Sequence, residues 1–187
     1  RKTIPRDISW LSFNHRVLQE AQDTTVPLKE RIRFLGIYSN NADEFFRVRV
    51  ATLRRMQDLG SKAKMHLEHD PEAILEEIQE KMASLQEDFE KAWRDVKKEM
   101  AGQQIFLINE KKLSASQKRY VLDYFNDQVR SYIVPLMIQD IQEFPALSDK
   151  GLYLACTLSK KDGTRKRSFA LVSVPTKHIS RFLVLPS

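Results

Sequence analysis

The sequence predicts a mainly α-helical protein, in which an N-terminal helical bundle is followed by the start of an α+β domain with a β-hairpin. Apolar residues recur at helical spacing through the first 100 residues. After Gly102 the pattern changes to short β-type runs, two of which flank an Asp-Gly turn signal. We therefore expect a helical domain over residues 1–103 and an incomplete α+β domain over residues 104–187.

Composition sets limits on the class of protein. A hydrophobic content of 42% supports a core, and the net charge is +6. Residues 1–60 carry 11 basic and 7 acidic side chains, residues 61–110 carry 7 and 12, and residues 111–187 carry 13 and 6. Basic surfaces attract polyanions of any kind, so charge does not separate nucleic acid, polyphosphate and acidic lipid. A single cysteine, Cys156, and the lack of a membrane-length apolar run predict a cytoplasmic protein. Peripheral association with the inner membrane face stays open as an alternative location.

Two helices are expected before residue 38. The first runs from about Asp7 or Ser9 to Ala21, and its apolar side carries Trp10, Phe13, Val17, Leu18 and Ala21. The second begins at Pro27, because proline suits the first position of a helix. Its apolar positions are Leu28, Ile32 and Leu35, with Phe34 and Ile37 close by.

A third helix is expected to begin at Asn41 and to fade near Gly60. The Asn41 side chain is a good N-cap, since its oxygen can accept from free N–H groups of the first turn. Glu44 then falls where a capping box would place it, and Asp43 adds negative charge at the positive end of the helix dipole.

Arg49 does not fit the amphipathic pattern of this third helix. At 3.6 residues per turn it lies in the apolar stripe, between Phe45 and Phe46. A guanidinium there needs a carboxylate, a phosphate or a domain interface as its partner. A structural salt bridge is the favoured interpretation.

A long fourth helix follows a polar loop over residues 61–69. Asp70-Pro71 is a cap-plus-first-position signal, and no Gly or Pro interrupts the pattern until Gly102. Apolar residues form three heptads, which we expect to pack on the other helices rather than in a free coiled coil. They are Leu75, Ile78, Met82, Leu85, Phe89, Ala92 and Val96.

The second domain is predicted from short signals. Residues 105–108 form a β-type run, and Ser114 with Gln117 caps a helix that ends before Pro135. Strands are expected over residues 152–158, 168–174 and 182–185, with the hairpin turn at Asp162-Gly163.

The hairpin is basic, and two interpretations stand beside each other. A charged edge discourages addition of another strand, and this interpretation is favoured. The alternative is a contact for a polyanion such as polyphosphate. The residues concerned are Lys160, Lys161, Arg165, Lys166 and Arg167.

The sequence offers no self-contained catalytic or metal site. Its five glycines are not clustered into a phosphate loop, and no Cys–His arrangement is present. His66 and His69 are three residues apart but lie in a polar linker without further ligands, so a metal site is disfavoured. His15 and His178 are isolated, and packing or surface roles are the default.

Three blocks of sequence resemble a known family. The run from Ser9 to Ala21 is followed by Pro27-Leu28, Glu30-Arg31 and the run from Phe34 to Phe46, and a third block spans Glu99–Glu110. Together they resemble the N-terminal domain of bacterial polyphosphate kinase and its junction with the family's head domain. The blocks are collinear long strings, and beyond about residue 140 the resemblance rests on order and hydrophobic pattern.

The resemblance implies a role for this chain. Family members move a terminal phosphate between ATP and inorganic polyphosphate through a phosphohistidine, and that histidine and the Mg²⁺ site belong to domains outside this chain. Asn41 matches the family's adenine-contacting asparagine, with Asn40 as the second candidate. A side-chain amide offers a donor and an acceptor side by side. No catalytic residue and no metal ligand is expected in this chain. The resemblance also implies that the enzyme forms a homo-oligomer through its N-terminal and head domains.

The rival hypothesis is a non-enzymatic helical module that binds a protein or a polyanion. It would do so through the apolar stripe of the third helix that contains Arg49 and through the basic hairpin. Its basic residues lack the interleaved aromatic residues of a single-strand binder, and no nucleic-acid-binding motif is present. We therefore expect no specific nucleic-acid partner.

Overall fold

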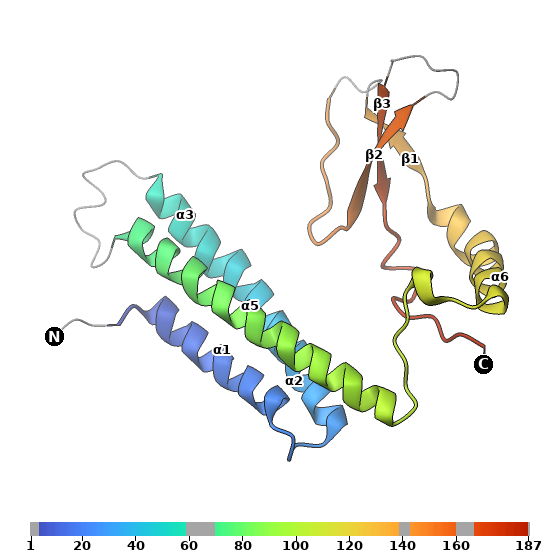
Figure 1. Cartoon of the computed structure of the whole chain (residues 1–187). Coiled ribbons are helices and arrows are strands. Elements are labelled where there is room, and N and C mark those ends of the chain that lie inside the picture. The colour runs from blue at the N-terminus through green and yellow to red at the C-terminus, as the bar shows by residue number, and fades with distance from the viewer. Residues whose placement is uncertain (1–3, 59–69, 139–142, 160–166, 187) are drawn as a thin grey trace. The chain divides into compact units, whose positions relative to one another are not determined.

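The computed structural model describes residues 4–58, 70–138, 143–159 and 167–186 (Figure 1). It divides into two compact units, Arg1–Leu107 and Ile108–Ser187. The first unit is helical, and the second combines helices with a three-stranded sheet. This confirms the predicted mainly α fold with a β-hairpin in its second part.

The first unit is built from helical segments of different lengths. They are α1 (Arg6–Gln22), α2 (Leu28–Phe45), the π-helix η1 (Phe46–Val50), α3 (Ala51–Gln57) and α5 (Pro71–Gly102). The segments α2, η1 and α3 follow one another without a break, and α5 packs against α1, α2 and α3 (Figure 1). The predicted starts at Pro27 and Asp70-Pro71 are confirmed, since Pro27 precedes α2 and the Asp70 carboxylate accepts from the Glu72 N–H. The predicted loop over 61–69, with His66 and His69, lies outside the described residues.

The core of this unit lies between α1, α2, α3 and α5. The predicted heptads of α5 are confirmed, because Ile78, Leu85, Ala92 and Val96 are buried and Leu75, Met82 and Phe89 pack beside them. Three residues expected on apolar sides are instead exposed, namely Phe13 at 58%, Ile32 at 38% and Ile37 at 45%. Helices α1 and α2 therefore bury a narrower stripe of side chains than the helical wheel predicted. The buried core consists of Ile8, Leu11, Leu18, Ala21, Leu35, Tyr38, Phe45, Val50, Leu53, Ile74, Ile78, Leu85, Ala92 and Val96.

The predicted N-cap at Asn41 is wrong. Helix α2 runs from Leu28 through Asn41 to Phe45, so Asp43 and Glu44 lie in its last turn rather than in the first turn of a new helix. Asparagine and serine are weak helix formers, but they do not break a helix as glycine and proline do. Burial of Tyr38 and Phe45 on either side of Asn41 outweighs its preference for a cap.

The second unit begins with short helices. They are η2 (Glu110–Lys112), α6 (Ala115–Tyr124), η3 (Phe125–Val129) and η4 (Arg130–Tyr132). The predicted start of α6 is confirmed as a capping box, in which Ser114 Oγ accepts from the Gln117 N–H and Gln117 Oε1 accepts from the Ser114 N–H.

The sheet of the second unit has the order β1-β3-β2 and is antiparallel throughout. Its strands are β1 (Pro135–Met137), β2 (Tyr153–Ser159) and β3 (Arg167–Ser173). Cys156 pairs with Ala170, and Leu136 pairs with Leu171. The two hairpin strands are confirmed, whereas the turn at Asp162-Gly163 lies outside the described residues.

Two predicted strands are wrong. Residues 105–108 and 182–185 have strand-like composition but form no strand in the described structure. A strand needs a partner for its backbone groups, and neither run is paired with one in that part of the chain. Strand β1 was not expected from the sequence, because Pro135 indicated only the end of a helix.

Candidate functional site

Helix α1 and the α2–η1 segment meet through three side-chain pairs in register. Asp7 pairs with Arg49, Trp10 stacks on Phe45, and Asn14 is hydrogen-bonded to Asn41. The positions rise by three or four residues on α1 and fall by four on α2–η1, as expected for one face of each of two antiparallel helices. We call these three pairs the cross-helix ladder.

The amide end of the ladder consists of Asn14 and Asn41. Asn14 is 1% exposed, and its Nδ2 donates to the backbone carbonyl of Tyr38 at 3.2 Å. Its Oδ1 accepts from Asn41 Nδ2 at 3.0 Å. The Tyr38 carbonyl can only accept, so it fixes which end of the Asn14 amide faces it, and Asn14 in turn fixes Asn41.

This arrangement leaves part of the Asn41 amide available. Asn41 is partly exposed, and within the described part of the chain no hydrogen-bond donor contacts its Oδ1. One N–H of its Nδ2 is used by Asn14, and the other remains. Ile37 lies one helical turn away and is 45% exposed, so it presents apolar surface beside the amide. Asn40, the other amide that the sequence singled out, is exposed and takes no part in the ladder.

The ionic end of the ladder is a bidentate pair. Arg49 Nε donates to Asp7 Oδ1 at 2.7 Å, and Nη2 donates to Oδ2 at 3.2 Å. The sequence predicted that Arg49 would be the buried member of such a pair. In the structure Asp7 is the buried member, because its side chain is 8% exposed and that of Arg49 is 45% exposed. The hydrogen bond to Asp7 raises the pKa of Arg49 above its ordinary value.

The salt bridge that the sequence favoured for Arg49 is confirmed, with Asp7 as its partner. Arg49 follows Phe45 by four residues and lies in the π-helix η1, where each turn holds more residues than an α-helical turn. Phe45 then faces Trp10, with ring centroids 4.6 Å apart, while Arg49 reaches Asp7. No signal in the sequence indicated this wide turn.

Arg31 was missed by the sequence analysis. Its side chain is 2% exposed, Nε donates to the Ala21 carbonyl at 2.8 Å, and Nη1 donates to Glu99 at 2.5 Å. It thus joins α2 to the C-terminal end of α1 and to α5. Its position four residues before Leu35, on the buried face, was the signal that could have revealed it.

Tyr38 lies in the same core and is unusual in another way. It stacks on Phe89 with ring centroids 5.5 Å apart, and its hydroxyl is buried without a hydrogen-bond partner. Burial, with a smaller contribution from Asp88, raises the pKa of Tyr38.

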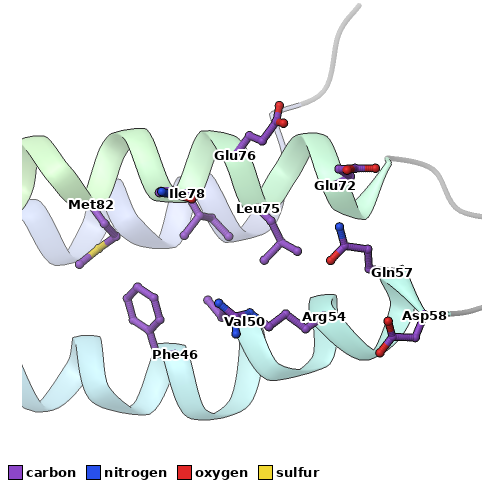
Figure 2. A pocket seen from close by; sticks show the side chains of 11 residues that line it. Phe46, Val50, Arg54, Gln57, Asp58, Glu72, Leu75, Glu76, Ile78 and Met82 are labelled. Atoms are coloured by element: carbon purple, nitrogen blue, oxygen red, sulfur yellow. The ribbon is translucent and has the colours of Figure 1, made fainter.

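A groove of about 760 Å³ lies between η1–α3 and α5. Figure 2 shows Phe46 and Val50 on one side of it and Leu75, Ile78 and Met82 on the other. Charged residues also line it, namely Arg54, Asp58, Glu72 and Glu76. Three carboxylates against one guanidinium disfavour a phosphate group there. Asn41 is not among the lining residues.

The remaining residues singled out by sequence lie apart from the ladder. His15 Nε2 is 3.4 Å from Asp88 Oδ2, and His178 stacks on Tyr132 in the second unit. Arg167 is the first residue of β3, whereas Lys160, Lys161, Arg165 and Lys166 lie outside the described residues. In the described ranges no three His, Cys, Asp or Glu side chains gather into a metal-binding group.

Comparison with protein-family models gives two matches. Residues 3–108 match the polyphosphate kinase N-terminal domain, and residues 116–187 match the polyphosphate kinase middle domain.

Individual relatives agree with the family models. The chain is 41% identical over 188 residues to a polyphosphate kinase of Vibrio parahaemolyticus, and 41% identical over 190 residues to one of Escherichia coli K12. It superposes on the crystal structure of a polyphosphate kinase from Porphyromonas gingivalis with a TM-score of 0.80 and 30% identity.

All three matches cover 98% of this chain and 26% of the relative, so the chain spans about a quarter of the length of these proteins. Among the described helices, none has the length and apolar character that crossing a membrane would require.

Proposed function

The chain belongs to the polyphosphate kinase family, and from that premise we propose that it forms the adenine side of an ATP site within a longer enzyme. That enzyme would transfer the terminal phosphate of ATP to inorganic polyphosphate and back. The observation that carries the proposal is the Asn41 amide, which is partly exposed and held in one orientation by Asn14.

The chemistry of the Asn41 amide suits a purine edge. Adenine presents an exocyclic N6 donor beside an N1 or N7 acceptor, which complements a side-chain amide in a bidentate pair. Asn41 retains its Oδ1 and one N–H for such a pair. Ile37, exposed one turn away, supplies apolar surface against which a base ring can pack.

The phosphoryl-transfer chemistry belongs elsewhere in the enzyme. Such chemistry needs positive charge clustered around the moving group. The described residues near Asn41 supply no such cluster, because Arg49 is engaged with Asp7 and Arg31 with Glu99. We therefore propose that the phosphohistidine and the ligands of Mg²⁺ lie outside this chain. The isolated chain is expected to show no ATP-to-polyphosphate transfer, and measurable polymer formation from labelled ATP would contradict this.

The family also suggests partners and an assembly. We propose ATP, ADP and polyphosphate as ligands of the longer enzyme, and a cytoplasmic homo-oligomer built through its N-terminal and head domains. Polyphosphate contact by the basic residues 160–167 remains part of this proposal. Charge reversal at both Arg165 and Arg167 tests this contact. An unchanged affinity for polyphosphate would show that these residues do not bind it.

The direct test of the base contact is an NMR titration of the chain with ATP up to millimolar concentration. We expect shifts clustered at residues 37–46, including the side-chain amide of Asn41. Asn41→Ala should abolish these shifts while the rest of the spectrum stays folded, and Asn40→Ala is the matched control that should retain them. Equal loss in both variants, or retention in both, would contradict the assignment to Asn41.

A further inference from the structure

We propose that Asn14 is a positioning residue that fixes the Asn41 amide so that the site accepts a 6-amino purine and rejects a 6-oxo purine. The inference rests on the proposed function, because it deepens the role of the same site. It concerns the base specificity of the site and assigns that specificity to a buried residue that does not itself reach the base.

The first step is the direction of the hydrogen-bond chain. The Tyr38 backbone carbonyl accepts from Asn14 Nδ2, and Asn14 Oδ1 accepts from Asn41 Nδ2. The carbonyl has no proton to give, so each amide along the chain must point its nitrogen toward the group before it. Asn41 therefore ends the chain with its oxygen as the available acceptor.

The second step is the cost of reversing that direction. Turning Asn41 by 180° would set its oxygen against Asn14 Oδ1, two acceptors facing each other. Turning both amides would move the same conflict to the Tyr38 carbonyl. Asn14 is 1% exposed, so water cannot relieve the mismatch, and an unpaired buried polar group is costly. The orientation of Asn41 is thus set from inside the helix pair.

The third step is the chemistry of the base. Adenine carries an amino donor at position 6, which meets the Asn41 oxygen favourably. In the position that adenine takes, guanine and hypoxanthine would set their carbonyl oxygen O6 against that oxygen as a second acceptor. Sites that hold a polar group in one orientation reject the mismatched analogue more strongly than apolar pockets do. We expect a preference of about tenfold or more for the 6-amino base.

The experiment titrates the chain with ATP and with inosine triphosphate, which replaces the 6-amino group by an oxygen. Dissociation constants are read from the backbone signals of residues 37–46 and from the Asn41 side-chain amide. The wild-type chain should bind ATP about tenfold or more tightly than inosine triphosphate. Equal binding of the two nucleotides at Asn41 would overturn the inference and leave the proposed function intact. The absence of any ATP-dependent shift at Asn41 would overturn both.

A variant then tests whether Asn14 supplies the preference. Asn14→Leu keeps a similar volume but frees Asn41 to turn over, so the preference for ATP should fall to about twofold or less. Asn14→Ser, too short to reach both partners, should behave in the same way if the leucine variant fails to fold. Asn40→Ala should keep the wild-type ratio. A folded Asn14 variant that retains the full preference would contradict the positioning role.

Discussion

The first unit (Arg1–Leu107), called here the helical unit, and the second unit (Ile108–Ser187), called the strand unit, hold their side chains in place by different means. In the helical unit, apolar residues of α1, α2, α3 and α5 form one buried core, and polar residues such as Asn14 and Arg31 are enclosed within it. In the described part of the strand unit, two hydrophobic side chains are buried, Ala170 and Leu171. Apolar neighbours in the sheet remain open, with Leu154 at 55% and Phe169 at 48% exposure.

The difference teaches where a side chain can be held in one orientation. A backbone ladder fixes the register of strands, but it leaves exposed side chains free to choose rotamers. Close packing with buried hydrogen bonds fixes the side chain itself. This difference supports the proposal that the amide that contacts the base, Asn41, lies in the helical unit. The predictions below test how firmly each part of that unit is held.

The largest expected effect is loss of core packing in the helical unit. Leu18 is fully buried, and Leu18→Ala should lower the free energy of unfolding by about 3 kcal/mol. The matched change in the strand unit, Leu154→Ala, removes a side chain that is 55% exposed and should cost about 0.5 kcal/mol or less. Urea unfolding followed by tryptophan fluorescence for the first variant, and by hydrogen exchange of β2 and β3 for the second, measures both. Equal costs would break the comparison.

Removal of the buried guanidinium ranks second. Arg31→Met keeps much of the side-chain volume but leaves the Ala21 carbonyl and Glu99 without their donor. Because Glu99 is 41% exposed and can be rehydrated, we expect a loss of about 2 kcal/mol. Arg33→Met is the control, since Arg33 is 70% exposed and its pair with Glu30 should contribute about 0.5 kcal/mol or less. Similar urea midpoints for the two variants would show that Arg31 is not structural.

The ionic end of the ladder should contribute less. Asp7→Asn removes the negative charge opposite Arg49, whose side chain is 45% exposed and finds water in its place. The expected loss is about 1 kcal/mol. Asp43→Asn weakens the solvent-accessible pair with Arg47 and should lower the free energy of unfolding by about 0.3 kcal/mol. Thermal unfolding measures both variants. A larger loss of stability for Asp43→Asn than for Asp7→Asn would contradict a stabilising role of the Asp7–Arg49 pair in the cross-helix ladder.

The smallest effect at neutral pH is expected at Tyr38. Tyr38→Phe removes a buried hydroxyl without a partner, so stability at pH 7 should be unchanged or slightly higher. The pKa of Tyr38 is raised by burial, so its stabilising contribution is complete below the ordinary tyrosine pKa of about 10. That contribution is lost as pH rises through the raised pKa. Wild type should therefore lose more stability than Tyr38→Phe between pH 9 and about 11. Parallel curves of unfolding free energy against pH would disprove this.

The sequence predicted the fold better than it predicted the site. Helix starts at Pro27, Asp70 and Ser114 follow from local backbone chemistry, and the structure confirms each of them. The heptads of α5 were predictable because apolar periodicity reflects burial directly.

The site depended on interactions between distant residues, which local patterns do not encode. Asn41 resembled a cap because its real partner, Asn14, lies 27 residues away in sequence. Arg49 was recognised as needing a partner, but the π-turn and Asp7 that define its place had no local signal. Polar residues enclosed by tertiary packing, such as Arg31, break the rule that buried residues are apolar.

The central claim is that the nucleotide base contacts the helical unit at Asn41, and photolabelling with 2-azido-ATP tests it most directly. After irradiation and proteolysis, mass spectrometry locates the labelled peptide. We predict labelling within residues 34–47, competed by ATP and lost in Asn41→Ala. Label confined to residues 108–187, or label in the helical unit that Asn41→Ala leaves unchanged, would contradict the account.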